Sequence, residues 1–280
     1  MIRSRLLELG LEPVGGRPTS RMSRVGRRAY RVDAERAAMG TRVAVSVIGG
    51  SRDRLETAVG EAFEEMDRLI AIFTRYESAS AVSVLNDAGR LDLPPPELAA
   101  LLRRAGRFHR RTGGAFDVSV APLVDLFQRR RVAAGATPPG PTVTPTPAEI
   151  AGAMAVVGAD RIRATAREIR LDRSGMRVTL DGIAKGFIVD AMVGALERRR
   201  VRRYLVDGGG DIRTRGRAGE RRPWTVAVRD PAGNATPLDV VRPGNGALAT
   251  SGGYERYHAG DPRFHHLVDG ASGTSPRRTA

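Results

Sequence analysis

Four short glycine-bearing turns carry polar side chains that are placed to face a ligand. Glycine lets a bound molecule approach the backbone closely, and main-chain amides at a turn or a helix start attract anions such as phosphate. Taken singly, each turn has a plain chain reversal as its simpler interpretation. The four turns are Thr112-Gly-Gly-Ala-Phe-Asp117, Leu180-Asp-Gly-Ile-Ala-Lys-Gly186, Val206-Asp-Gly-Gly-Gly-Asp211 and Ala249-Thr-Ser-Gly-Gly-Tyr254.

The second turn places Lys185 in the first turn of an expected helix. The helix dipole disfavours a cation there unless the cation meets an anion. Lys185 is the only lysine in a chain that otherwise uses arginine. A compact ammonium group fixed on a phosphate or carboxylate is one interpretation, and a solvated surface lysine is the other. Neither a P-loop nor a GxGxxG motif occurs, so the common nucleotide-binding sites are not predicted.

The four histidines offer one candidate for a general base. His265 and His266 begin an alternating run that continues through Leu267 to Asp269, so one imidazole is expected to face inward. A histidine near a carboxylate acts as a general base at neutral pH. His109 lies on the polar side of its helix, where a structural or exposed role is expected.

Helices are predicted where apolar residues recur three and four positions apart. The clearest is a long amphipathic helix over residues 55–73, which Ser51 is placed to cap. A second helix, over residues 98–108, follows three prolines and ends before Gly113-Gly114. Further helices are expected over residues 148–157 and 184–200.

Alternating β-branched runs predict the strands. Residues 41–48 form the strongest run, and the runs 168–171 and 176–180 flank Asp172-Arg-Ser-Gly175 as a hairpin. Helices and strands mix without a regular βαβ alternation, so an α+β fold with an antiparallel sheet is expected. Further strands are expected at residues 203–206, 225–228, 247–250 and 266–268.

The chain divides into an arm and a domain. Residues 1–36 are basic and show no periodicity, so they are predicted to form a flexible arm. Residues 37–280 are predicted to form one domain, interrupted by a loop rich in proline and threonine at residues 133–147.

Composition excludes several classes of protein. The chain has no cysteine, which rules out disulfides, iron–sulfur clusters and thiolate metal ligands. The net charge is +15, but the arginines are scattered over almost every segment, so no nucleic-acid partner is expected. No apolar run approaches the roughly 18 to 20 residues that cross a bilayer. With no signal peptide or lipidation cysteine recognised at the start, a cytoplasmic protein without stable membrane insertion is expected.

Taken together and in order, these segments resemble the FAD:protein FMN transferases, the ApbE-like flavin transferase family. The resemblance spans about residues 37–276. The matching stretches are Met39-Gly-Thr41, Phe73-Thr-Arg-Tyr76 with Ser83-Val-Leu-Asn86, Thr112-Gly-Gly-Ala-Phe-Asp-Val-Ser-Val-Ala-Pro-Leu123, Asp181-Gly-Ile-Ala-Lys-Gly-Phe187 with Asp190, Leu205-Val-Asp-Gly-Gly-Gly-Asp211, Ala247-Leu-Ala-Thr-Ser-Gly-Gly-Tyr254, and His266-Leu-Val-Asp269 with Gly273 and Pro276.

The resemblance implies an enzyme that binds FAD and Mg²⁺, cleaves FAD, and attaches FMN to a threonine of an acceptor protein while AMP leaves. It implies His266 as the general base and the main-chain carbonyl of Gly182 as a metal ligand. A flat surface for a flavin or adenine ring is expected from Tyr76 and Phe116. The FAD contacts implied by the resemblance are Met39, Tyr76, Ala115, Phe116, Asp117, Thr179, Lys185, His266 and Leu267.

One departure from the family pattern concerns the metal. Members of the family continue beyond the equivalent of Pro276 into a segment whose Asp and Thr supply side-chain metal ligands, and this sequence has no counterpart of them. The expectation is therefore an incomplete metal site in a C-terminally shortened domain. A non-catalytic FAD-binding protein of the same fold is the alternative to the transferase.

Overall fold

The computed structural model describes residues 19–133, 145–220, 222–230, 236–252 and 267–276. These residues fall into two compact units. Unit 1 holds the described residues between 19 and 70 and between 185 and 251, and unit 2 holds those between 71 and 184 and between 252 and 276. Two helices cross the boundary along the chain, namely α2 (Arg52–Phe73) and α7 (Ala184–Arg198).

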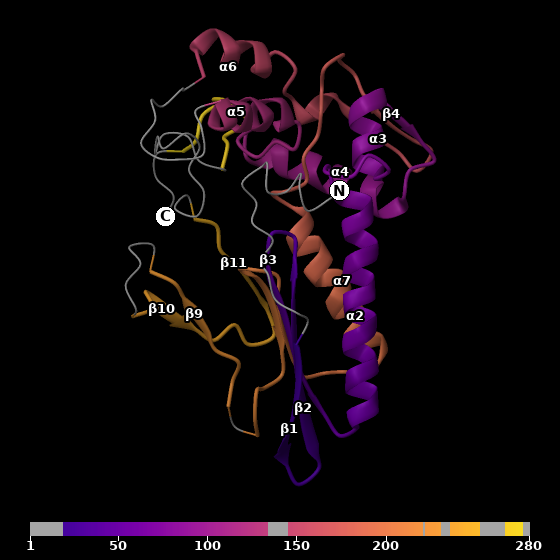
Figure 1. Ribbon diagram of the computed structural model, residues 1–280, viewed down its shortest axis with the longest axis vertical. Helices are drawn as coiled ribbons and strands as arrows, with labels where there is room; N and C mark the ends of the chain where they lie inside the picture. The colour runs from indigo at the N-terminus through magenta and orange to yellow at the C-terminus, as the bar shows by residue number, and fades with distance from the viewer. Residues whose placement is uncertain (1–18, 134–144, 221, 231–235, 253–266, 277–280) are drawn as a thin grey trace. The chain divides into compact units, whose positions relative to one another are not determined.

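Unit 1 is built on a six-stranded antiparallel sheet with the strand order β1-β2-β3-β7-β8-β11 (Figure 1). A separate two-stranded ribbon joins β9 (Val226–Val228) to β10 (Asp239–Val241). The strands of the large sheet are β1 (Thr19–Gly26), β2 (Ala29–Ala38), β3 (Thr41–Gly49), β7 (Tyr204–Asp207), β8 (Asp211–Arg215) and β11 (Ala247–Ala249).

The alternation of β3 explains how this sheet buries one face. Val43, Val45 and Val47 are all buried, whereas Ala44 and Ser46 between them are only half-buried. The helices α2 and α7 lie along the face that carries the valines (Figure 1). The long amphipathic helix predicted over residues 55–73 is thereby confirmed as α2, which contributes buried side chains at three- and four-residue steps.

The N-terminal arm is where the sequence prediction and the structure differ most. Residues 1–18 lie outside the described residues, but β1 and β2 form a hairpin and β2 pairs along the whole length of β3. Val32 and Ala34 alternate with Arg31, Asp33 and Glu35 and are buried. This short alternation is strand-forming, although the surrounding charges obscure it. The predicted flexible arm is therefore wrong for residues 19–36.

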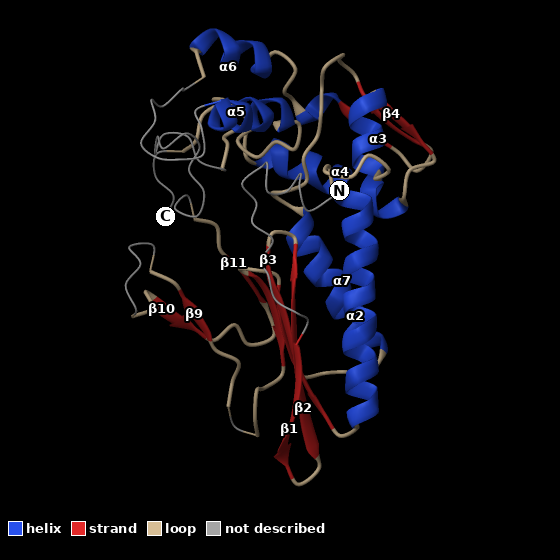
Figure 2. Cartoon of the chain, viewed as in Figure 1, coloured by secondary structure: helices blue, strands red, loops and turns tan. Residues whose placement is uncertain are grey.

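Unit 2 combines helices with a three-stranded sheet of order β4-β6-β5 (Figure 2). Its core gathers Val120, Leu123 and Phe127 with Val157, and Val268 packs against them. The elements of unit 2 are α3 (Ala81–Ala88), β4 (Arg90–Asp92), α4 (Pro96–Arg111), α5 (Ala121–Ala133), α6 (Pro147–Met154), the 3-10 helix Ala159–Arg161, β5 (Ile162–Ala164) and β6 (Glu168–Leu171).

The predicted hairpin of residues 168–171 and 176–180 is wrong. Both edges of β6 are occupied by β4 and β5, so no edge is left for residues 176–180. The amide of Thr179 instead donates to the carbonyl of Val118 at 2.8 Å. Both polar main-chain groups of Val178 are bonded by the side chain of Asn86. This extended segment satisfies its backbone without joining a regular sheet.

The predicted α+β class is confirmed, since mixed helices and antiparallel sheets make up both units. The helix predicted at residues 148–157 is α6, where Thr146 and Glu149 form a capping box. Most of the predicted loop at residues 133–147 lies outside the described residues. Among the described residues, none of the helices combines the length and the apolar character that a membrane span requires.

Candidate functional site

In unit 1, Met39 occupies a tight turn between β2 and β3. Its φ of 53° and the φ of 71° at Gly40 are both left-handed, as a two-residue hairpin turn that matches strand twist requires. A non-glycine residue rarely adopts this conformation, so the turn holds Met39 in a strained but defined position. The next residue, Thr41, lies so close to Gly209 that a Cβ at Gly209 would overlap the threonine side chain.

The glycine loop that follows β7 is held by its own aspartate. Asp207 accepts hydrogen bonds from the amides of Gly209 at 2.8 Å and Gly210 at 3.0 Å. Thr250 donates its amide to the carbonyl of Gly210 at 3.0 Å. Residues 39–41 and 206–211 and the described residue Thr250, each from a sequence segment singled out above, therefore meet within unit 1.

Lys185 lies in the first turn of α7, as predicted. Its Nζ is 3.8 Å from Oδ2 of Asp211, and both side chains remain partly exposed. Burial raises the pKa of Asp211, Lys185 opposes that change, and Asp207 adds to it. Of the two anions considered for Lys185, phosphate and carboxylate, the described residues supply the carboxylate.

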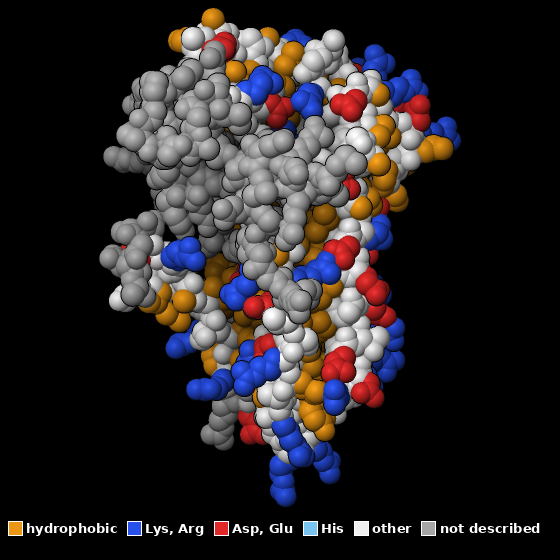
Figure 3. Space-filling view, viewed as in Figure 1, with side chains coloured by type: hydrophobic (Ala, Val, Ile, Leu, Met, Phe, Trp, Pro, Cys, Tyr) orange, Lys and Arg blue, Asp and Glu red, His pale blue; other side chains and the backbone are white. Residues whose placement is uncertain are grey.

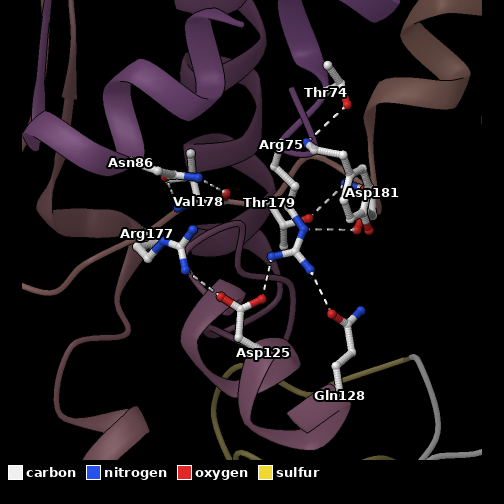
Figure 4. A network of polar contacts seen from close by, with 10 residues as sticks. Thr74, Arg75, Asn86, Asp125, Gln128, Arg177, Val178, Thr179 and Asp181 are labelled. Carbon is white, nitrogen blue, oxygen red and sulfur yellow. Dashed lines mark hydrogen bonds and ion pairs between the residues drawn. The ribbon is translucent and has the colours of Figure 1, made fainter. Parts of the chain in front are cut away.

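In unit 2, Arg75 lies at the centre of a network of polar contacts (Figure 4). Its Nη1 donates to Oδ1 of Asp125 at 2.6 Å and its Nη2 to Gln128 at 3.4 Å. The other carboxylate oxygen of Asp125 accepts from Arg177 at 2.7 Å. Burial alone would lower the pKa of Arg75, but the ionisable side chain of Tyr76 and the carboxylates of Asp125 and Asp181 together raise it, so the guanidinium is charged.

Two predicted FAD contacts, Tyr76 and Thr179, lie beside this network. The guanidinium carbon of Arg75 is 5.2 Å from the centre of the Tyr76 ring. Thr179 is buried, and its hydroxyl accepts from the amide of Asp181 at 3.3 Å. The Asp181 carboxylate is 61% exposed, and its Oδ2 is 3.9 Å from Nε of Arg75.

In the predicted FAD turn at residues 115–117, one side chain is buried and the other two are accessible. The Asp117 side chain is only 1% exposed and accepts hydrogen bonds from Ser119 and from the amide of Ala159 at 2.9 Å. Nδ1 of His109 lies 3.1 Å from the same carboxylate. Because these internal contacts occupy the Asp117 carboxylate, its predicted role as a ligand-contacting side chain is not favoured. Ala115 is exposed and Phe116 half-buried, so both remain accessible.

The turn also contacts two other predicted segments of unit 2. A Cβ at Gly182, the predicted metal ligand, would lie 3.4 Å from the Phe116 ring. Gly270 donates its amide to the carbonyl of Ala115 at 2.9 Å. The predicted base, His266, lies outside the described residues, whereas Leu267 is half-buried and follows it directly in the chain. Leu267 and Val268 lie in no strand, so that part of the strand predicted at residues 266–268 is wrong.

Sequence reasoning missed the charged network around Arg75. Arg75 and Asn86 both lie inside stretches singled out by the resemblance, but nothing local identified their partners. Asp125 is 50 positions from Arg75 along the chain and only 2.6 Å from it in space. In the sequence, the available signal was an arginine directly before an aromatic residue, Arg75-Tyr76.

Basic and acidic side chains are mixed on the face of the molecule that Figure 3 shows. On the face drawn in Figure 3, Lys and Arg side chains are spread over several elements and interspersed with Asp and Glu. Arg199, for example, pairs with Glu61, and this bond lowers the pKa of the glutamate. Within the described part of the chain, no group of three or more His, Asp or Glu residues is placed to hold a metal ion.

Comparison with known proteins places this geometry in a family. The sequence model of the ApbE family matches residues 39–280. A Haemophilus influenzae protein called FAD:protein FMN transferase is 31% identical in an alignment that covers 78% of this chain and 65% of that protein. A Vibrio cholerae protein of the same name is 28% identical in an alignment that covers 78% of this chain and 64% of that protein. The chain thus spans somewhat less than two thirds of these relatives.

The fold agrees with solved structures. The apbe protein of Thermotoga maritima superposes with a TM-score of 0.75 and 27% identity, covering 88% of this chain and 79% of that one. Flavin Transferase ApbE from Vibrio cholerae superposes with a TM-score of 0.71 and 24% identity, covering 93% and 80%. The fold defines an α+β protein of the kind seen in these flavin transferase structures. The chain belongs to the ApbE family, which confirms the resemblance.

Proposed function

We propose that this protein is a metal-dependent transferase that attaches the FMN part of FAD to a threonine of an acceptor protein. In the proposed reaction, the threonine oxygen attacks the phosphorus of the FMN moiety. The pyrophosphate bond breaks, AMP leaves with the bridging oxygen, and the hydroxyl proton passes to a base. The names of the relatives, FAD:protein FMN transferase, support the choice of donor and product.

The observation that carries the proposal is the convergence of the predicted contacts within each unit. Unit 1 brings Met39, the glycine loop and Lys185 together. In unit 2, Tyr76 lies beside Arg75, Thr179 lies beside Asp181, and Gly182 lies against the Phe116 ring. The ring surfaces of unit 2 suit a flavin or adenine ring, and the cation beside close-approach glycines in unit 1 suits a phosphate.

The chain's own residues have distinct proposed roles. Tyr76 and Phe116 hold a ring of FAD, and Lys185 meets a phosphate in exchange for part of its contact with Asp211. Gly182 offers a main-chain oxygen to Mg²⁺, which supplies charge neutralisation across the phosphates when it is bound. His266 takes the proton from the acceptor threonine.

The decisive experiment mixes the purified 280-residue chain with FAD, Mg²⁺ and a threonine-bearing acceptor peptide. We expect the peptide to gain the mass of FMN and AMP to appear in equal amount, with both abolished by a chelator. A peptide with alanine in place of the threonine serves as the control. FAD binding without AMP would instead identify a non-catalytic FAD-binding protein. No binding of FAD would refute the proposal.

The base is tested separately. His266→Ala is expected to bind FAD normally and to transfer FMN slowly, because the base acts only on the acceptor hydroxyl. Binding is followed by the change in flavin fluorescence and transfer by peptide mass. An equal loss of both would show that His266 has a structural role.

A further inference from the structure

Arg75 lies beside Tyr76 of the proposed flavin site and beside Asp181, which precedes the proposed metal ligand Gly182, and no sequence pattern assigned Arg75 a role. Its side chain is only 6% exposed. Its guanidinium carbon is 5.2 Å from the centre of the Tyr76 ring. Its Nε approaches the carboxylate of Asp181 (Figure 4). A buried guanidinium is costly to desolvate, so its position requires an explanation in the contacts it makes.

Two of the three guanidinium nitrogens of Arg75 donate hydrogen bonds, and the third does not. Nη1 and Nη2 donate to Asp125 and Gln128, both on α5, at 2.6 and 3.4 Å. Nε is buried and makes no hydrogen bond, although it lies 3.9 Å from Oδ2 of Asp181. Because the guanidinium is planar, holding its outer nitrogens on α5 fixes the direction of the Nε–H bond. That donor is therefore available to a carboxylate that moves about 1 Å closer.

Asp125 also binds a second arginine, Arg177, whose contacts can be compared with those of Arg75. Arg177 donates to Oδ2 of Asp125 at 2.7 Å and reaches it from the side opposite Arg75 (Figure 4). The Arg177 side chain is 41% exposed, so it resembles a surface ion-pair partner. Two arginines and one aspartate leave one positive charge, and Arg75 presents it toward Asp181.

We propose that Arg75 is a positioning residue for flavin transfer. Anchored by Asp125 and Gln128, it supports the ring of Tyr76 and, through Nε–H, orients the Asp181 carboxylate that precedes the proposed metal ligand Gly182. It acts through these neighbours and does not touch the reacting atoms. The inference rests on the proposed function, because it concerns how the same site holds FAD and Mg²⁺.

The test compares matched substitutions of the two arginines that share Asp125. Arg75→Lys and Arg177→Lys each keep the charge and remove a guanidinium from the same carboxylate. We expect the melting temperature to fall further in Arg75→Lys than in Arg177→Lys, because only Arg75 is buried. Only Arg75→Lys should raise the KM for FAD, by about tenfold or more, since displacement of a contact by about 1 Å costs up to 10²-fold. The KM for the acceptor peptide should not change in either variant.

A second variant keeps the proposal testable if Arg75→Lys does not fold. Asp181→Asn changes an exposed side chain, so the fold is expected to persist, while the KM for FAD and the Mg²⁺ concentration for half-maximal activity should both rise. In this background, Arg75→Lys should cost less than in the wild type, because the shared contact is already lost.

The outcomes separate the two proposals. A wild-type chain that transfers FMN, with equal kinetic effects in the two arginine variants or no effect of Asp181→Asn, would leave the transferase standing and overturn the role of Arg75. A wild-type chain that binds no FAD would overturn both.

Discussion

Replacing Asn86 by aspartate is expected to make the stability of the protein depend on pH in a defined way. Asn86 is buried on α3, where its Nδ2 donates to the carbonyl of Val178 at 2.9 Å and its Oδ1 accepts from the amide of Val178 at 2.6 Å. A neutral carboxylic acid can reproduce both bonds, because its hydroxyl donates and its carbonyl accepts. An ionised carboxylate loses the donor and faces the Val178 carbonyl with a negative charge.

The sign and size of the change in the free energy of unfolding follow from the protonation of the introduced aspartate in the folded and unfolded states. An aspartate in the unfolded chain titrates near pH 3.9. Burial and the lost donor raise its pKa in the folded state, so the penalty is absent below about pH 4 and grows as pH rises to the folded pKa. If the folded pKa is about two pH units higher, the loss in the free energy of unfolding at pH 7 is about 2.7 kcal/mol.

The assay is urea unfolding followed by far-ultraviolet circular dichroism between pH 4.5 and 8, with the wild type measured at each pH. Asn86→Ala is the control, because it leaves both main-chain groups of Val178 unpaired at every pH and should cost about 2–4 kcal/mol throughout. The reasoning fails if Asn86→Asp matches the wild type at pH 8. It also fails if the loss in stability does not shrink toward acid.

Three further predictions test other parts of the molecule. Lys185→Ala is expected to weaken FAD binding about tenfold without changing the melting temperature; unchanged affinity by flavin fluorescence would return Lys185 to a solvated surface role. Gly209→Ala should lower the free energy of unfolding by about 2–3 kcal/mol, and Gly244→Ala by clearly less. Both glycines have positive φ, but only a Cβ at Gly209 meets Thr41, so equal losses in urea unfolding would argue against that overlap. Burial, with a hydrogen bond to a glutamate, raises the pKa of Tyr204 to about 12. Its neutral phenol thus stabilises the fold fully below pH 10 and progressively less up to about pH 12. A titration at 295 nm should lose one late-ionising phenol in Tyr204→Phe, and an unchanged curve would contradict this.

Part of the fold could be predicted because its signals are local. The helices α2, α4 and α7 and the strand β3 each carry an apolar repeat that matches the period of the element. The strands β1 and β2 escaped prediction because only a few apolar residues alternate among many arginines. The prediction of a hairpin at residues 168–180 was wrong because strand pairing depends on which strand edges are free. One edge of β6 is occupied by β4, which lies much earlier in the sequence.

The candidate site divides in the same way. The sequence by itself determined the family, the order of the glycine turns and the placement of Lys185 at a helix start, since these depend on residue types at short spacing. Only the tertiary structure decided that Asp117 is occupied by internal hydrogen bonds, that Lys185 meets Asp211, and that Arg75 shares Asp125 with Arg177. The ion pairs of Lys185 with Asp211 and of Asp125 with the two arginines join side chains that are 26 to 52 positions apart in the sequence. The hydrogen bonds of Asp117 depend on its burial. Hydrophobic periodicity carries no information on such charge pairs, because they form only after packing has excluded water around them.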